Sequence, residues 1–282
     1  MNKNILEILA DSARARVEED KKRISESTMR DEATRLALSQ PNQTFPVEEA
    51  LKKDGISFIC EVKKASPSKG LIAEDFPYVE IAKEYEKAGA ACISVLTEPT
   101  KFLGSDAYLE EIAENVKTPL LRKDFTVDEY QIYQAKTLGA SMVLLICAIL
   151  DEETIKRYIE ICDALYLSAL VEAHTEEEIA MAVRSGARII GVNNRNLKDF
   201  TVDVHNSERL RKLVPEDVLY IAESGIQTAD DIRVLYNAGV IDNASSFNRY
   251  LIDQGKDRII RSGTKVIPAS ATYAEIAAII TK

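Results

Sequence analysis

The sequence has few residues of the kinds that form disulfides or hold metals. Its 282 residues include only two histidines, too few for a typical His-based zinc site, so we expect no metal. The four cysteines contain no C-x-x-C pair, and we interpret them as buried thiols in a reducing cytoplasm. They are widely spaced, at Cys60, Cys92, Cys147 and Cys162.

The sequence also lacks a long apolar run and an excess of positive charge. Its longest apolar run, Met142–Leu150, is about half the length of a membrane span, and the charged N-terminus shows no secretory signal. With 36 Lys and Arg against 46 Asp and Glu, the formal charge is −10, whereas nucleic-acid binding needs a basic surface. GxGxxG and P-loop patterns are absent, which argues against nucleotide binding. We therefore expect a cytoplasmic protein that binds neither membrane nor nucleic acid, although a small anionic ligand could be held by a few local cations.

Short apolar segments alternate with amphipathic ones along most of the chain. Asp151, Thr175 and Thr228 stand where helix N-caps are expected. The pattern predicts an α/β fold, and a closed (β/α)8 TIM barrel is favoured over a doubly wound sheet. The predicted helices are Tyr78–Ala88, Val127–Leu138, Glu152–Cys162, Thr175–Arg184 and Thr228–Asn237. The predicted strands read as buried on both faces, and they are Phe58–Val62, Cys92–Leu96, Pro119–Arg122, Met142–Ile146, Ser168–Glu172, Ile189–Asn193 and Leu219–Ala222.

A glycine repeat indicates where the eighth strand should begin. AGA at Ala88–Ala90, LGA at Leu138–Ala140 and SGA at Ser185–Ala187 each end a helix with a glycine suited to the left-handed C′ position. A strand begins about three residues after each of these glycines. A fourth copy, AGV at Ala238–Val240, predicts a strand at Asp242–Ser246, but the residues there, DNASS, are polar and turn-like. We therefore expect the eighth strand to be atypical or missing.

The tail after residue 240 contains one substitute strand, Lys265–Ile267, and a predicted helix, Thr272–Ile280. Either an insertion displaces the last strand to the substitute position, or the tail is foreign to the barrel. We divide the chain into an N-terminal helical extension (1–50), barrel units one to seven (51–240) and a divergent C-terminal segment of the same domain (241–282). The extension has one predicted apolar face, formed by Ile5, Leu6, Ile8 and Leu9.

Charged and polar residues interrupt or end five of the predicted strands. The carboxyl ends of the strands are where a βα barrel builds its active site, so these side chains should converge. Burying a charge costs several kcal/mol unless it is paired, and neighbouring Lys and Glu leave one group able to donate and another able to accept a proton. The pattern therefore predicts a proton-transfer site, although any single residue of the set could instead cap a strand at the solvent edge. The charged residues are Glu61, Lys63, Lys123, Glu172 and Glu223, and Asn193, Arg195 and Ser224 end strands of the same group.

Two loops are suited to binding an anion. ASPSKG (Ala65–Gly70) follows the first strand and could hold an anionic ligand or act as a lid. AESGI (Ala222–Ile226) places backbone N–H groups and a glycine at a helix entrance, which is one half of the usual phosphate site of a barrel. The other half should follow the eighth strand, where the pattern fails.

Six segments together resemble indole-3-glycerol-phosphate synthase, in order and in register from about residue 3 to 240. The two most specific are EVKKASPSKG (Glu61–Gly70) and LLRKDF (Leu120–Phe125). The others are SVLTEPTKFLGS (Ser94–Ser105), LVEAH (Leu170–His174), GVNNRNL (Gly191–Leu197) and IAESGI (Ile221–Ile226). The resemblance implies a (β/α)8 barrel and a carboxy-lyase of tryptophan biosynthesis. This enzyme would convert 1-(2-carboxyphenylamino)-1-deoxyribulose 5-phosphate to indole-3-glycerol phosphate, CO2 and water without a cofactor.

The resemblance also implies a role for each matching residue. Lys123 would be the general acid that protonates the substrate carbonyl. Lys63 would hold the substrate carboxylate and could act as the acid in dehydration, so the division of steps between the lysines stays open. Glu172 would be the acid/base partner, and Glu61 would support the lysines. Substrate binding is implied for Phe102 at the aromatic ring, for Ser66 and Gly225 on the phosphate side, and for Asn193, Arg195, Glu223 and Ser224.

The resemblance ends where the glycine repeat fails. Members of the family continue with an apolar strand and a turn that completes the phosphate site, whereas residues 241–262 here read IDNASSFNRYLIDQGKDRIIRS. We therefore weigh an active or impaired enzyme against a catalytically inactive barrel that binds a phosphate ligand or serves as an interaction module. An isomerase or aldolase of phosphorylated sugars is a third alternative. For the enzyme we expect a small phosphorylated substrate, a monomer or weak homo-oligomer, and a raised KM and low stability if the barrel edge is open.

Overall fold

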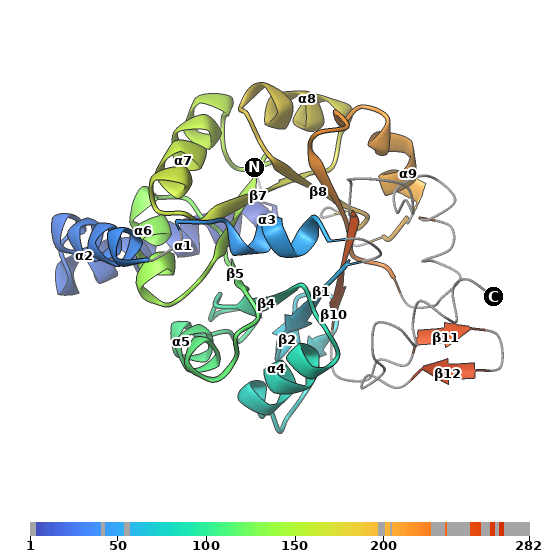
Figure 1. The fold of residues 1–282 in the computed structure, drawn as a ribbon, viewed down its shortest axis with the longest axis horizontal. Helices are drawn as coiled ribbons and strands as arrows, with labels where there is room; N and C mark the ends of the chain where they lie inside the picture. Colours follow the sequence, from blue (N-terminus) through green and yellow to red (C-terminus); the bar gives the residue numbers. More distant parts are fainter. Residues whose placement is uncertain are drawn as a thin grey trace.

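Eight parallel strands form a closed barrel that helices surround (Figure 1). This computed structural model describes residues 4–40, 43–53, 57–196, 201–203, 205–226, 235, 249–254, 260–262 and 265–267. The strands follow the order β1, β10, β9, β8, β7, β6, β5 and β4, and β4 pairs with β1 to close the barrel. The closed sheet rules out the doubly wound alternative. The strand bounds are β1 Ser57–Val62, β4 Cys92–Leu96, β5 Leu120–Lys123, β6 Met142–Ile146, β7 Ser168–Ala173, β8 Ile189–Asn193, β9 Leu219–Glu223 and β10 Arg249–Gln254.

Helices follow most of the strands, as the alternating pattern predicts. Asp151 and Thr175 accept backbone N–H groups as N-caps, and Gly89, Gly139 and Gly186 adopt the predicted left-handed conformation. Helices α5 and α9 were not predicted from the sequence, and the predicted helix Thr228–Asn237 lies outside the described residues apart from Leu235. Among the described residues, no helix combines the length and apolar character that a membrane span requires. The helix bounds are α4 Tyr78–Lys87, α5 Asp106–Asn115, α6 Glu129–Thr137, α7 Glu152–Ala164, α8 Glu176–Arg184 and α9 His205–Arg211.

The eighth strand is present, but it begins later than the glycine repeat predicts. β10 pairs in parallel with β1 on one side and with β9 on the other, so that Tyr250 lies opposite both Ser57 and Ile221. Of the two expectations, an atypical or a missing strand, the first therefore holds: β10 closes the barrel but was not predicted at this position along the chain. The reason is that Arg249–Gln254 contains only three consecutive apolar residues between charged and polar ones, too short a run to stand out.

The substitute strand proposed at Lys265–Ile267 does form, as β12, but it is not part of the barrel. It pairs antiparallel with β11 (Ile260–Ser262) in a separate two-stranded sheet. The turn-like segment Asp242–Ser246 and the predicted helix Thr272–Ile280 lie outside the described residues.

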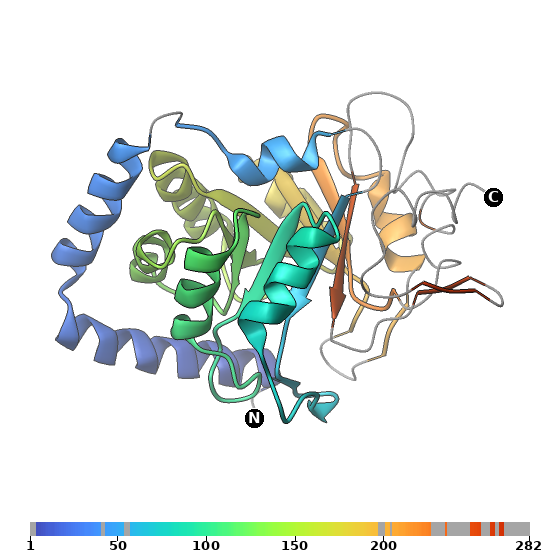
Figure 2. The same cartoon turned by 60° about the horizontal axis from the view of Figure 1, so that its bottom comes forward.

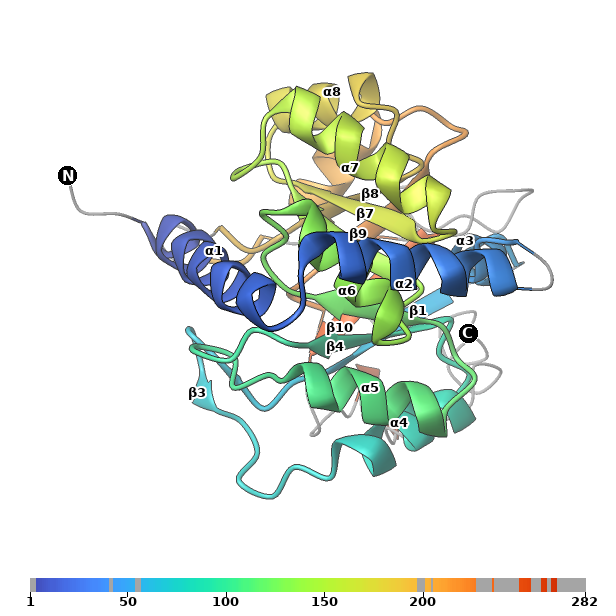
Figure 3. The ribbon, with the colours of Figure 1, turned by 90° about the vertical axis from the view of Figure 1, so that its left-hand side faces the viewer.

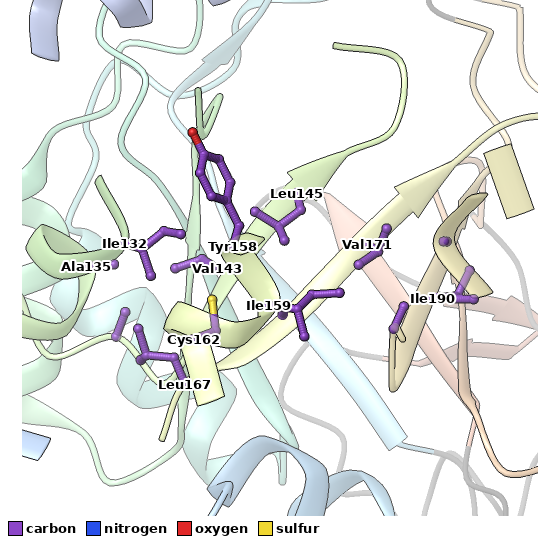
Figure 4. Packing of buried hydrophobic residues seen from close by; sticks show 14 of the residues in the cluster. Ile132, Ala135, Val143, Leu145, Tyr158, Ile159, Cys162, Leu167, Val171 and Ile190 are labelled. Carbon is purple, nitrogen blue, oxygen red and sulfur yellow. The ribbon is translucent and has the colours of Figure 1, made fainter. Parts of the chain in front are cut away.

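Successive residues of each strand point alternately into the barrel and toward the helices. Both faces of the sheet are therefore buried, one in the barrel interior and the other under the helices. Along β6, Val143 and Leu145 pack in the layer between sheet and helices, and Figure 4 shows them with Ile159 and Cys162 of α7. The two layers explain why the strands read as continuous apolar runs. Cys92, Cys147 and Cys162 are buried thiols, as predicted, whereas Cys60 is half-buried. The barrel interior is a second apolar cluster that includes Ile59, Cys92, Leu121, Met142, Leu144, Ile146, Leu170, Ile189, Leu219 and Ile221.

Three helices precede the first strand, namely α1 (Ile5–Arg23), α2 (Glu26–Ser39) and α3 (Pro46–Leu51). Figure 2 shows α1 and α3 at opposite ends of the barrel, with α2 running between them along its side, and Figure 3 shows α2 lying over α6. α1 and α3 both contribute to the interior cluster, so each covers one mouth of the barrel. The predicted apolar face of α1 is wrong at Ile8, which is 46% exposed, whereas Leu9 is buried.

Candidate active site

The predicted strand-end residues gather in one pocket at the carboxyl end of the barrel, under α1. The pocket encloses about 770 Å³, including space open to solvent. Its walls are partly apolar, with Ile5, Leu6 and Leu9 contributed by α1. Nine of the eleven predicted site residues line it, namely Glu61, Lys63, Ser66, Phe102, Lys123, Glu172, Asn193, Arg195 and Ser224.

Strand periodicity explains why these charges converge. Side chains two positions apart point to the same side of a strand, and four of the five charged residues, all except Lys63, stand two positions after an apolar residue of the barrel interior. Lys123 follows Leu121, and Glu172 follows Leu170. Charged groups therefore replace the apolar ones in the last interior layer before the open end.

Glu61 and Lys63 form a buried ion pair on β1 and just after it. The Lys63 ammonium lies 2.7 Å from Glu61 Oε1, and both side chains are at most 3% exposed. Ser94 of β4, which is in register with Glu61, donates a hydrogen bond of 3.4 Å to Glu61 Oε2. The pairing holds the Lys63 side chain at the pocket wall.

Lys123 lies beside two carboxyl groups, Glu172 of β7 and Glu223 of β9. Its Nζ is 3.5 Å from Glu172 Oε2 and 3.6 Å from Glu223 Oε2. Burial by itself lowers the pKa of Lys123, but the nearby carboxyl groups, led by the ionised Glu172, outweigh burial and raise it above the usual value. Lys123 is therefore held as an ammonium group.

The two carboxyl groups beside Lys123 differ in protonation. Burial raises the pKa of Glu172, but the charges of Lys123 and His174 lower it by a larger amount. The pKa of Glu172 therefore lies below its usual range. Burial and the charge of Glu172 raise the pKa of Glu223 well above its usual range. A hydrogen bond joins the two groups, and we place the shared proton on Glu223. The buried set is then two ion pairs and one neutral acid, without net charge.

Comparisons with known proteins identify the family of this chain. The family model for indole-3-glycerol phosphate synthase matches residues 6–242. The chain belongs to the indole-3-glycerol phosphate synthase family. The enzyme of that name from Ruminiclostridium cellulolyticum is 57% identical over 235 residues, which cover 83% of this chain and 89% of the relative. The one from Lachnoclostridium phytofermentans is 52% identical over 244 residues, which cover 84% and 90%.

Solved structures of lower identity share the fold of this family member. N-acetylmannosamine-6-phosphate 2-epimerase from Clostridium perfringens aligns with a TM-score of 0.54 and 16% identity, over 72% of this chain and 88% of its own. The YdjI aldolase from Escherichia coli K12 aligns with a TM-score of 0.51 and 16% identity, over 74% and 79%. At this identity they support the barrel fold alone. The match to the synthase family ends at residue 242, so β10 and the residues after it lie outside it.

Two of the predicted substrate-binding residues do not line the pocket of this synthase-family barrel. Glu223 lies behind Lys123, and Gly225 follows the lining residue Ser224. Ser224 and Gly225 both have positive φ values, +67° and +84°, which turn the chain sharply after β9. The second phosphate loop expected after the eighth strand falls on residues 255–259, outside the described residues.

Glu98 positions Phe102 and was not predicted from the sequence. The buried carboxylate of Glu98 accepts backbone N–H groups from Thr100, Lys101 and Phe102, at 2.8 to 3.0 Å. These bonds fix the loop after β4 and present the Phe102 ring to the pocket, 6.5 Å from the ring of Phe125. A lone Glu among Thr and Pro residues gives no periodic signal by which to find it.

A second missed contact ties α1 to the strand end that carries Lys123. Arg16 donates to both carboxylate oxygens of Asp124 at 2.7 Å, and Thr97 donates to the same carboxylate at 2.7 Å. The Asp124 side chain is 1% exposed. Because Asp124 directly follows Lys123, the ion pair joins the covering helix to the residue next to the proton donor.

Replacing Arg16 with Ala is expected to lower the free energy of unfolding by about 1.5–3 kcal/mol, the range for hydrogen bonds to charged groups. The buried Asp124 would keep its charge without its main partner. Urea denaturation measures the change. Arg14→Ala is the matched control on the same helix, because Arg14 and its partner Asp11 are 53% and 43% exposed, and such pairs contribute about 0–1 kcal/mol. Equal losses of unfolding free energy in the two variants would contradict the larger stabilisation that we expect from the Arg16–Asp124 pair.

Proposed function

We propose that this chain catalyses the indole-3-glycerol phosphate synthase reaction of tryptophan biosynthesis, as a carbon–carbon lyase of the cytoplasm. It would act on 1-(2-carboxyphenylamino)-1-deoxyribulose 5-phosphate and form indole-3-glycerol phosphate, CO2 and water. The observation that carries the proposal is the Lys123 ammonium, whose side chain is 15% exposed and lies 3.5 Å from the ionised Glu172, in a pocket with apolar walls. A donor and an acceptor held side by side away from water are what an acid–base condensation requires.

The first step is ring closure, for which we assign Lys123 as general acid. The aromatic carbon that bears the carboxylate attacks the ketone carbon, and Lys123 transfers a proton to the carbonyl oxygen as it becomes a hydroxyl group. Lys63 would hold the substrate carboxylate during this step, and Phe102 would pack against the aromatic ring. Both side chains line the pocket with Lys123.

The later steps remove CO2 and water. Breaking the bond to the carboxylate releases CO2 and restores the aromatic ring. Dehydration then needs an acid for the leaving hydroxyl, which we assign to Lys63, and a base for the neighbouring C–H proton, which we assign to Glu172. Two protons are donated and one is accepted, so each turnover takes one proton from solvent. Glu172 can return its proton to Lys123, which lies beside it.

The remaining predicted residues would bind the substrate. Ser66 on the loop after β1 and Ser224 with Gly225 after β9 are proposed for the phosphate side, since serine hydroxyl and backbone N–H groups suit an anion. Asn193 and Arg195 at the end of β8 are proposed to orient the substrate, with Glu223 acting through Lys123. Arg195 brings a positive charge to the pocket wall, which suits a substrate that carries a carboxylate and a phosphate.

Turnover of the anthranilate-derived ribulose phosphate by the purified full chain tests the proposal. We expect indole fluorescence to increase at a rate proportional to protein concentration. The match to the family ends before β10, so the competing function is an inactive barrel that binds phosphate ligands. Folded protein that binds indole-3-glycerol phosphate, yet forms no product from the substrate, would favour this competitor and overturn the proposal.

A further inference from the structure

His174 stands two positions after Glu172, at the point where β7 has ended. Its Nε2 lies 3.7 Å from Glu172 Oε1, and its Nδ1 lies 3.5 Å from Glu178 Oε2 of α8. Glu178 also accepts the backbone N–H of His174, at 2.6 Å, which fixes the start of the loop. Within the part of the chain that the structure describes, the buried Nε2 atom has no hydrogen-bond partner.

The two oxygens of Glu172 therefore face different cations. Oε2 faces Lys123, and Oε1 faces His174. With His174 protonated, Lys123, Glu172, His174 and Glu178 form a row of alternating charges that runs from the pocket to α8. A carboxylate held at both oxygens keeps one orientation, whereas one held at a single oxygen can rotate.

We propose that His174 is a positioning residue of the reaction, whose imidazolium holds Glu172 Oε1 so that Oε2 stays aimed at Lys123 and the substrate. This inference rests on the proposed function. His174 lines a neighbouring hollow with Thr175 and Asn206 and is not among the residues that line the reaction pocket. It acts through Glu172, so its loss should affect kcat more than KM.

The charge of His174 depends on the groups that face it. Burial lowers the pKa of His174, but the hydrogen bond to Glu178 and the charge of Glu172 raise it above the usual value, against a smaller opposing effect of Lys123. The thiol of Cys147, directly after β6, donates a hydrogen bond of 3.6 Å to the backbone carbonyl of Glu178, and burial, with the charges of Glu178 and Glu172, raises the pKa of that thiol. Glu172 is in turn faced by Lys123, Glu223 and Asn193. His174 carries its positive charge when it is protonated. The charge is therefore present at pH values below the pKa of His174 and is lost as the pH rises through that pKa.

The pH profile of kcat separates positioning from a merely structural role. We expect wild-type kcat to fall on the alkaline side as His174 loses its proton. His174→Gln keeps an N–H group but no charge. It should lower kcat by about 10- to 100-fold, as misplacement of a catalytic group does, with little change in KM. The pH profile of this variant should also lack the fall in kcat on the alkaline side. His205→Gln is the matched control, because His205 is the other of the two histidines and is 66% exposed on α9. A His174→Gln enzyme with wild-type kcat and an unchanged limb would overturn the proposal.

A second measurement does not depend on turnover. In the His205→Gln background the single imidazole signal in the NMR spectrum belongs to His174, and its titration midpoint can be followed directly. Adding Glu172→Gln should lower that midpoint, because the carboxylate that stabilises the imidazolium is gone. An unchanged midpoint would overturn the proposed contact. A lowered midpoint together with no turnover by the wild-type protein would instead refute the proposed function and leave the His174–Glu172 contact standing.

Discussion

Replacing Lys123 with Met is expected to lower kcat by about 10²- to 10⁴-fold, the usual contribution of a general acid. Methionine has nearly the length of lysine but no proton to donate, so the developing alkoxide would lack its acid. It also leaves the ionised Glu172 without the cation that lies 3.5 Å away. Fluorescence assays at saturating substrate measure the loss, and circular dichroism checks that the barrel still folds.

Lys136→Met is the control for removing a buried lysine. Lys136 on α6 is 6% exposed, and burial lowers its pKa, but it does not line the reaction pocket. We expect this variant to keep wild-type kcat. A Lys123→Met enzyme that retains more than about a tenth of wild-type kcat would contradict the assignment of a general acid.

Most of the barrel could be predicted because its signals are local. A strand that is buried on both faces reads as an apolar run, and a helix that ends at a left-handed glycine marks where the next strand begins. Three predicted strands, Cys92–Leu96, Met142–Ile146 and Ile189–Asn193, have the observed bounds. β10 was missed because its apolar run is short and it comes several residues later than the glycine repeat predicts.

The main residues of the candidate site could also be predicted from local signals, but the residues that support them could not. Charges in apolar strands mark the open end of the barrel, so Lys123 and Glu172 could be placed together from the sequence. The groups that support them, Arg16 and His174, make their contacts through side chains of separate elements. No local periodicity encodes such a contact. His174 also stands in a loop after a strand, where a polar side chain more commonly faces solvent.

Gly191 is the clearest case of a missed residue that had a signal. It lies in the middle of β8, where glycine weakens a strand unless another group approaches closely. A Cβ atom at this position would lie 2.0 Å from Glu223 Oε1 and 3.0 Å from Leu170 Cδ1. The absent side chain provides the space that the Glu223 carboxyl group occupies beside Lys123.

Replacing Gly191 with Ala should push Glu223 out of this space and away from Lys123. We expect kcat to fall by about 10²-fold, as it does when a catalytic group is misplaced by about 1 Å, and the free energy of unfolding to fall by about 1–3 kcal/mol from overpacking. A double-mutant cycle with Glu223→Ala tests the cause, because that truncation removes the carboxyl group that the added methyl would strike. In the Glu223→Ala background, Gly191→Ala should then cost little further activity or stability. Full losses in both backgrounds would mean that the methyl group disturbs the strand itself, and that the glycine does not act by making room for Glu223.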